Sequence, residues 1–387
     1  MLVHMPAIFL VLYIAFFQSS VKNAAPAANS PAQAASQQTA VRPTQAVHPQ
    51  LTAAEIARLQ STAAGGNAVA QYNLALAYQN GNGVPKDLKL TFDWCKKAAE
   101  QDNADAETAL GVMYRSGEGV DEDLQAAVQW YEKASRQGNP SAMFDLGAAY
   151  YNGDGVPVDD SLSYAWFVLA KEAGSPQAVQ AVGRAESDLS PFEITVGYRR
   201  LAEICTDGKY APVNRVEAAS WALKAATLGD PPSQLRIAQM FLEGQGVAQD
   251  FGRARYWCSR AAKGGGVGDR GGDYCLGYIY QHGLGVPANP KAARKWYKLA
   301  ANAGLASSIR ALARMEESGQ GAKPDLMGAA VLYAELAMSN DKDALQQVIR
   351  LRNKMSAKDW KEVQKRCPNY SVDPQKLKAL LHQTATH

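Results

Sequence analysis

Residue types that carry catalysis or bind metals are scarce in this sequence. Of the five histidines, only His282 lies among residues that follow a regular pattern, and the other four are near the ends of the chain. A Ser-His-Asp relay needs a histidine beside its nucleophile, and zinc sites usually combine several histidine, cysteine or carboxylate ligands. We therefore expect neither a histidine-based metal site nor such a relay, no catalytic residues and no cofactor.

A second set that could carry chemistry consists of one aspartate or asparagine in each of seven similar segments. Carboxylates in this number could act as acid–base pairs or hold a metal ion. Six of the seven stand four positions after a glycine and directly before an amphipathic stretch. That is the place of a helix N-cap, whose side chain accepts hydrogen bonds from free N–H groups. We interpret all seven as caps: Asp87, Asp123, Asp159, Asn214, Asp250, Asn289 and Asp325.

The elements that carry these residues repeat along the chain. Glycine pairs such as Gly81 and Gly83 recur with the same spacing as the aspartates. A period of 20 to 50 residues is typical of proteins built by stacking one supersecondary unit. Tryptophans separated by 36, 36, 55, 36 and 39 residues mark the period here: Trp94, Trp130, Trp166, Trp221, Trp257 and Trp296.

Each unit is predicted to consist of two short helices joined by a turn. In the first unit, Leu74 and Tyr78 share one face of an amphipathic helix. A Gly-x-Gly turn then ends this helix, since glycine adopts positive φ at little cost. The next helix begins after Asp87 and places Trp94 on its buried side two turns later.

The pattern L-G-x-x-Y, then G-x-G-V-x-x-D, then A-x-x-W-Y-x-K-A-A closely resembles the Sel-one-like repeat family, relatives of tetratricopeptide repeats. Near-consensus stretches are WYEKA at 130–134 and WYKLAA at 296–301. The resemblance covers about Ala68 to Asp341, which is seven units. It implies an all-α fold, a right-handed α-solenoid of helix-turn-helix repeats with a concave surface that binds a protein or peptide partner.

The N-terminal residues have features of an export signal. Ala7–Phe17 is an apolar run of 11 residues, too short to span a bilayer as a helix, which needs about 20. Ala25-Pro26-Ala27 is a small-x-small cleavage candidate, although no Lys or Arg precedes the apolar run. We expect a signal peptide at 1–27, a disordered Ala/Pro/Gln-rich linker at 28–52 and a periplasmic or secreted mature protein without an integral membrane segment. The alternatives are an uncleaved anchor or a misassigned start.

The 55-residue gap between Trp166 and Trp221 divides the repeats into two groups. Shifting the chain by 166 residues aligns 165–201 with 331–367, and both segments read as a helix, a serine-initiated turn and a second helix. A solenoid needs closing elements because its last repeat otherwise exposes an apolar face. We predict two capped arrays, at 53–205 and 198–370, followed by a flexible tail at 371–387.

None of the five cysteines forms a Cys-x-x-Cys pair, which argues against a zinc site. Cys258 lies in the second helix of the fifth unit and Cys275 in the first helix of the sixth, so antiparallel neighbours carry them. A disulfide between them is permitted in an exported protein if their Cα atoms lie within about 7 Å. We expect Cys95 to be a buried thiol.

The resemblance to tetratricopeptide repeats also implies which side chains face a partner. In those repeats the first helix lines the groove, through positions two before and two after the consensus leucine and one after the consensus tyrosine. Tyrosine and arginine, which dominate interface energetics, recur there. The alternative is that the aromatic residues pack between adjacent helices. The candidates for the groove are Tyr72, Leu76, Gln79, Arg115, Phe144, Tyr151, Arg199, Glu203, Gln239, Tyr274, Tyr278, Gln281, Arg310, Arg314 and Glu317.

Three functions are compared, of which the first two are implied by the resemblance. The chain has 40 basic and 37 acidic residues, a net charge of +3, which gives no reason to expect a nucleic-acid partner. We expect a non-catalytic, monomeric scaffold or adaptor of the bacterial cell envelope that binds a protein. A hydrolase acting on cell-wall or β-lactam substrates is one alternative. Glycan binding along an aromatic groove is another.

Overall fold

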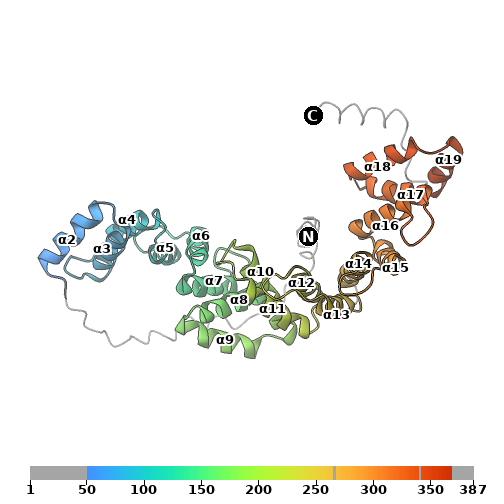
Figure 1. Cartoon of the computed structure of the whole chain (residues 1–387). Helices are drawn as coiled ribbons and strands as arrows, with labels where there is room; N and C mark the ends of the chain where they lie inside the picture. The colour runs from blue at the N-terminus through green and yellow to red at the C-terminus, as the bar shows by residue number, and fades with distance from the viewer. Residues whose placement is uncertain (1–49, 265–266, 340, 368–387) are drawn as a thin grey trace, which may run out of the picture. The chain divides into compact units, whose positions relative to one another are not determined.

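The computed structural model describes residues 50–264, 267–339 and 341–367 (Figure 1). These residues form eighteen α-helices and no strand, so the predicted all-α fold is confirmed. None of these helices is long and apolar enough to cross a membrane. The predicted signal peptide at 1–27, almost all of the linker at 28–52 and the tail at 371–387 lie outside the described residues.

Each of seven repeats contributes two helices. The first helices are α3 (Ala68–Asn80), α5 (Ala104–Ser116), α7 (Pro140–Asn152), α10 (Pro191–Asp207), α12 (Pro231–Glu243), α14 (Val267–His282) and α16 (Ala306–Ser318). The second helices are α4 (Leu88–Ala99), α6 (Leu124–Arg136), α8 (Asp160–Glu172), α11 (Arg215–Thr227), α13 (Phe251–Ala261), α15 (Pro290–Asn302) and α17 (Leu326–Ala337). The remaining helices are α2 (Ala53–Ala64), α9 (Pro176–Asp188), α18 (Lys342–Arg352) and α19 (Ala357–Arg366).

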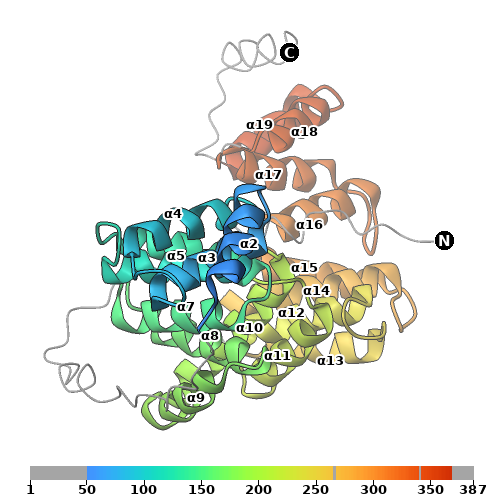
Figure 2. The same ribbon diagram turned by 90° about the vertical axis from the view of Figure 1, so that its left-hand side faces the viewer.

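The helices follow one another in space in the order of the sequence. Each first helix packs on the second helix of its own repeat, and that second helix packs on the next first helix, as α4 does on α5 (Figures 1 and 2). The inward side of the first helices carries a row of leucines, of which Leu74, Leu110, Leu146 and Leu201 are completely buried. The predicted α-solenoid of seven repeats is therefore present.

A small residue brings the two helices of a repeat into close contact. A Cβ atom added to Gly111 of α5 would lie 2.4 Å from the ring of Tyr131 in α6. The same addition to Gly277 of α14 would place the Cβ 2.6 Å from the ring of Tyr297 in α15. The aromatic ring therefore takes the volume that any larger side chain on the first helix would need.

The predicted helix caps are confirmed. The Asp87 carboxylate accepts a hydrogen bond from the backbone N–H of Leu90 at 3.0 Å, and the corresponding residue of every other repeat caps its second helix in the same way. Each carboxylate or amide thus binds the beginning of its own helix, and Asp159 also pairs with Arg200 of α10 at 3.6 Å. Among the described residues, no group of three or more histidine, cysteine, aspartate or glutamate side chains could hold a metal ion.

The insertion between the third and fourth repeats is a single helix, α9. It packs against α8 and lies outside the succession of repeats in both ribbon views (Figures 1 and 2). Helix α10 instead packs on both α8 and α11, and a Cβ on its Gly197 would lie 2.5 Å from the Tyr164 ring of α8. The stack therefore continues through α10, which belongs to both predicted arrays, 53–205 and 198–370. The division of the repeats into two capped arrays stays a prediction.

Helices α13 and α14 are joined by a disulfide. Cys258 and Cys275 are bonded, with their Cα atoms 5.8 Å apart, within the reach that such a bond requires. Cys95, Cys205 and Cys367 are buried thiols. Burial raises the pKa of Cys95 and of Cys205 to about 12, which makes both poor nucleophiles at neutral pH.

The second glycine of the turn between the two helices fixes how closely neighbouring repeats approach. Gly155 has φ +74° and packs on the start of α6 in the preceding repeat, where an added Cβ would lie 2.3 Å from the Leu124 carbonyl oxygen. Gly119 faces Leu88 in the same way, and Gly321 faces Pro290. A residue with a Cβ at this position meets backbone, which cannot move aside as a flexible side chain can.

We predict that Gly155→Ala destabilises the protein more than Gly174→Ala. Both glycines have positive φ, which costs an L-residue about 1–2 kcal/mol, but a Cβ at Gly174 would meet nothing within 4 Å. Overpacking at Gly155 should cost about 1–3 kcal/mol more in the free energy of unfolding. Chemical denaturation of both variants measures the difference, and equal losses would show that the turn does not set the repeat spacing.

Candidate protein-binding surface

Several candidate groove residues on the first helices pack between helices. Tyr274 and Tyr278 of α14 are each only 8% exposed, and the Tyr274 ring centroid lies 5.5 Å from that of Tyr297. Tyr72 and Phe144 are half-buried, and the Phe144 ring lies 5.4 Å from Phe167 of the same repeat. For these residues the alternative interpretation, packing between adjacent helices, describes the contacts that the structure shows.

Two candidate arginines bind the N-cap of a following helix. The Arg199 guanidinium of α10 lies 3.4 Å from the Asp230 carboxylate, which caps α12. In the same way Arg310 of α16 pairs with Asp341, which caps α18. Both acids already accept a hydrogen bond from their own helix, so each arginine ties one first helix to the beginning of the next. A pair of this kind positions neighbouring repeats and leaves less of the guanidinium for a partner.

The polar candidates are also engaged within the protein. The Gln281 side chain accepts a hydrogen bond from the Tyr297 hydroxyl at 2.8 Å and donates one to Gln320 at 3.1 Å. The Glu317 carboxylate binds Arg350 of α18 at 2.6 Å. Gln239 donates to Glu243 at 3.0 Å, and Glu203 pairs with Arg200 at 3.5 Å.

The candidate side chains that remain open to solvent come from separate repeats. Tyr151, at the end of α7, is 58% exposed, and Arg314 of α16 is exposed beside Tyr333. Arg115 of α5 has 38% of its side chain exposed. Leu76 and Gln79 of α3 are half-buried. The structure thus places the predicted residues on successive first helices and does not bring them together in one compact site.

Asp145 of α7 is a largely buried acid that the groove offsets do not include. Its carboxylate lies 3.9 Å from the Arg115 guanidinium, and 15% of its side chain is exposed. Burial raises the pKa of Asp145 to about 6, and the positive charge of Arg115 opposes this shift. The equivalent residues of the first two repeats are Asn73 and Ala109. No recurring residue type marks the position, so the repeat pattern could not have indicated it.

A second buried acid lies at the contact between the first two repeats. Glu107 of α5 is fully buried, and its carboxylate lies 2.8 Å from the Lys133 ammonium of α6. Lys133 also donates a hydrogen bond to the Ala99 carbonyl of α4 at 3.0 Å. Burial raises the pKa of Glu107 more than Lys133 lowers it. These contacts join three helices of two repeats, so this group stabilises the stack.

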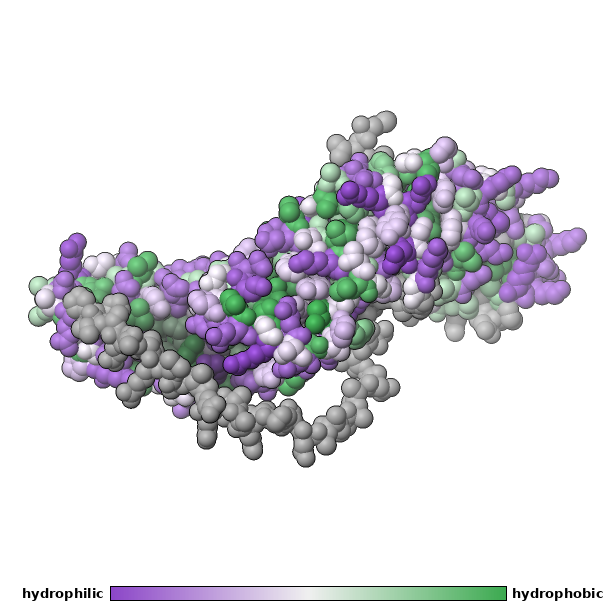
Figure 3. All heavy atoms as spheres, turned by 90° about the horizontal axis from the view of Figure 1, so that it is seen from below, coloured by the Kyte–Doolittle hydropathy of each residue, from purple (hydrophilic) through white to green (hydrophobic). Residues whose placement is uncertain are grey.

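The opposite side of the repeats carries isolated apolar side chains. Seen from below, small hydrophobic areas alternate with hydrophilic ones (Figure 3). Val216 of α11 is 68% exposed, Leu228 directly after α11 is 59% exposed, and Tyr256 of α13 is 52% exposed. Scattered exposed apolar residues are normal in soluble proteins and do not by themselves mark an interface.

Seven segments of the chain match the family model of the Sel1 repeat, and together they cover well over half of it. They are residues 68–103, 104–139, 140–175, 195–230, 231–266, 274–305 and 306–341. The chain belongs to the Sel1 repeat family. Proteins built from this repeat are generally non-catalytic scaffolds for protein interactions.

Solved structures of related repeat proteins are similar to this chain. One is c5321, a protective antigen present in uropathogenic Escherichia coli strains, which displays an SLR fold. It has 30% identity, covers 82% of this chain and 71% of its own, and gives a TM-score of 0.41. A Sel1 repeat protein from Oxalobacter formigenes has 27% identity, 77% and 80% coverage and a TM-score of 0.37. A comparison with curated proteins finds no match.

We predict that Asp145→Asn removes a pH-dependent part of the stability. The pKa of this carboxyl is about 6 in the folded protein and about 4 in the unfolded chain. Above pH 4 the carboxyl ionises more readily in the unfolded chain, so ionisation favours unfolding. The wild-type free energy of unfolding should therefore fall, relative to the amide variant, by about 2–3 kcal/mol as pH rises from about 4 to about 6. Chemical denaturation at a series of pH values tests this. Parallel curves for the two proteins would contradict the assignment.

Proposed function

We propose that this Sel1 repeat protein is an adaptor that binds a protein partner through the exposed side of its first helices. The observation that carries the proposal is the unbroken succession of seven first helices, which presents side chains from every repeat along one side. Tyr151 and Arg314 are the exposed candidates there, and both residue types contribute strongly to interfaces. An extended surface of this kind suits an extended peptide or a broad protein face.

We further propose that the mature protein works outside the cytoplasm, in the bacterial cell envelope. The disulfide between Cys258 and Cys275 supports this location, because such bonds persist in oxidising compartments and are rare in the cytosol. The apolar run at Ala7–Phe17 supports it as well.

The location predicts both the mass and the thiol content of the protein isolated from its own cells. After denaturation and alkylation without reductant, the envelope fraction should contain a species with three modified cysteines: Cys95, Cys205 and Cys367. Its intact mass should lack about 20–30 N-terminal residues. A full-length species with all five cysteines alkylated, found with the cytosolic fraction, would contradict export.

The binding surface predicts different effects for two exposed tyrosines. Tyr151→Ala, on the first helix α7, should weaken binding of a partner purified with the wild-type protein by about 1–2 kcal/mol. Tyr256→Ala, on the second helix α13, has a similar exposure and should leave the affinity unchanged. Calorimetric titration measures both affinities, and melting curves verify that neither variant is unfolded. Loss of binding only in Tyr256→Ala would place the interface on the second helices.

A further inference from the structure

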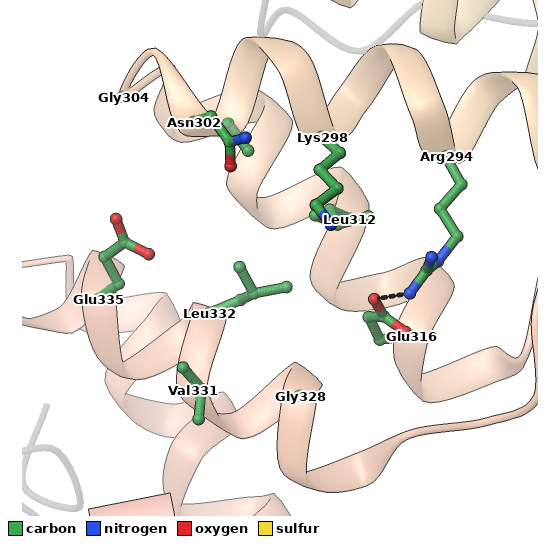
Figure 4. Close-up of a pocket in the computed structure, with 11 residues that line it drawn as sticks. Arg294, Lys298, Asn302, Gly304, Leu312, Glu316, Gly328, Val331, Leu332 and Glu335 are labelled. Carbon is green, nitrogen blue, oxygen red and sulfur yellow. Dashed lines mark hydrogen bonds and ion pairs between the residues drawn. The ribbon is translucent and has the colours of Figure 1, made fainter. Parts of the chain in front are cut away.

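The last two repeats form an open cavity, and none of the candidate groove residues lines it. It has a volume of about 520 Å³ and lies between the second helices α15 and α17, next to the first helix α16 (Figure 4). Leu312, Val331 and Leu332 provide apolar lining, and Lys298 and Glu335 provide charged groups. A volume of this size falls within the range of small-molecule sites.

The cavity exists because the seventh repeat lacks the tryptophan of the other six. Leu332 stands seven residues after the cap Asp325, as Trp130 stands seven residues after Asp123. In the second repeat, Trp130 packs against a buried cluster that includes Ala99 and Leu110. The equivalent residues of the last two repeats, Ala301 and Leu312, line the cavity. The space that an indole ring fills elsewhere in this chain is therefore left open by the shorter leucine.

A pair of aromatic rings found between the first two repeats is also replaced beside the cavity. Between the first two repeats, Phe92 and Tyr114 form an edge-to-face contact with centroids 5.5 Å apart. The equivalent residues are Arg294 and Glu316, which form an ion pair at one wall of the cavity (Figure 4). The cavity thus combines apolar lining residues, at a place where other repeats pack aromatic rings, with charged lining residues.

The lining of the cavity includes a lysine that can face an indole ring. In this chain the Lys97 ammonium lies 4.1 Å from the centroid of the Trp94 ring, and the Lys224 ammonium lies 3.8 Å from that of Trp221. Each lysine stands three residues after its tryptophan, whereas Glu335 stands three residues after Leu332, so the cation at the cavity comes from the neighbouring helix instead. At the cavity, Lys298 extends from α15 toward Leu312 (Figure 4). A buried indole N–H needs an acceptor, and the lining carboxylates Glu316 and Glu335 can provide one.

We propose that this cavity is a second binding site, which takes the tryptophan side chain of a protein partner. The partner's ring occupies the place that the seventh repeat's own tryptophan would fill, with its face toward Lys298 and its N–H toward a carboxylate. The site lies on the second-helix side of the repeats and does not depend on the first-helix surface proposed above. The two proposals can therefore fail independently.

The test is a titration of the full-length protein with N-acetyl-tryptophanamide, followed by protein-observed NMR. The wild type should bind with a dissociation constant near the millimolar range, as is usual for one side chain, and resonances of Leu332 and Ala301 should shift. Leu332→Trp, which restores the tryptophan of the other repeats, should weaken binding at least tenfold and raise the melting temperature. Leu299→Trp, at a 44% exposed position of α15 that does not line the cavity, is the matched control and should bind as the wild type does.

A second variant keeps the test valid if Leu332→Trp does not fold. Lys298→Ala should weaken binding several-fold without changing the melting temperature, because Lys298 is exposed. Absence of wild-type binding at millimolar concentrations, or equal binding by wild type and Lys298→Ala, would overturn the proposal. Free tryptophan that binds tenfold more tightly than the blocked amide would also overturn it, because the site would then recognise an amino acid and not a protein side chain.

Discussion

Contact between the backbones of neighbouring repeats sets the spacing on which the rest of the stack depends. The second glycine of a turn lies against the carbonyl group that begins the preceding second helix, as Gly155 does against Leu124. No side chain fits between these atoms, so the distance between second helices is fixed by backbone and not by the size of a core residue. Between the first two repeats, Trp130 packs into the gap that this leaves beside the second helix, and in the seventh repeat the equivalent gap is left open at Leu332.

Most of the fold could be predicted from local chemistry. Cap residues, glycine pairs and tryptophans recur because each repeat packs against the same kind of neighbour. The same residue types are therefore needed at the same positions of successive repeats. Even the disulfide could be anticipated, since the repeat places Cys258 and Cys275 on adjacent antiparallel helices. The role of α10 was harder to predict, because a serine-initiated closing helix and a first helix have the same amphipathic pattern.

The binding surface was less predictable. The position of a residue within a helix indicates which side of the helix it lies on, but not which residues of other repeats contact it. Arg199 has the predicted offset in its first helix, yet Asp230, which caps the next first helix, lies within reach and pairs with it. Tyr278 has the same offset as Arg314, but it is buried while Arg314 is exposed. The loss of a tryptophan at Leu332 is visible in the sequence. Whether the surrounding helices would close over the gap depends on packing that only the structure shows.

Helix α10 has a consequence for how the protein unfolds. In repeat proteins each unit is stabilised mainly by its immediate neighbours, so cooperativity passes from one end to the other only through successive contacts. Because α9 lies to the side, the first three repeats are joined to the last four by the packing of α10 on α8 and by the turn after α10, where the Tyr210 carbonyl accepts a hydrogen bond from the Ser135 hydroxyl of α6. The strength of these two contacts therefore decides whether the whole stack melts in a single transition or in two.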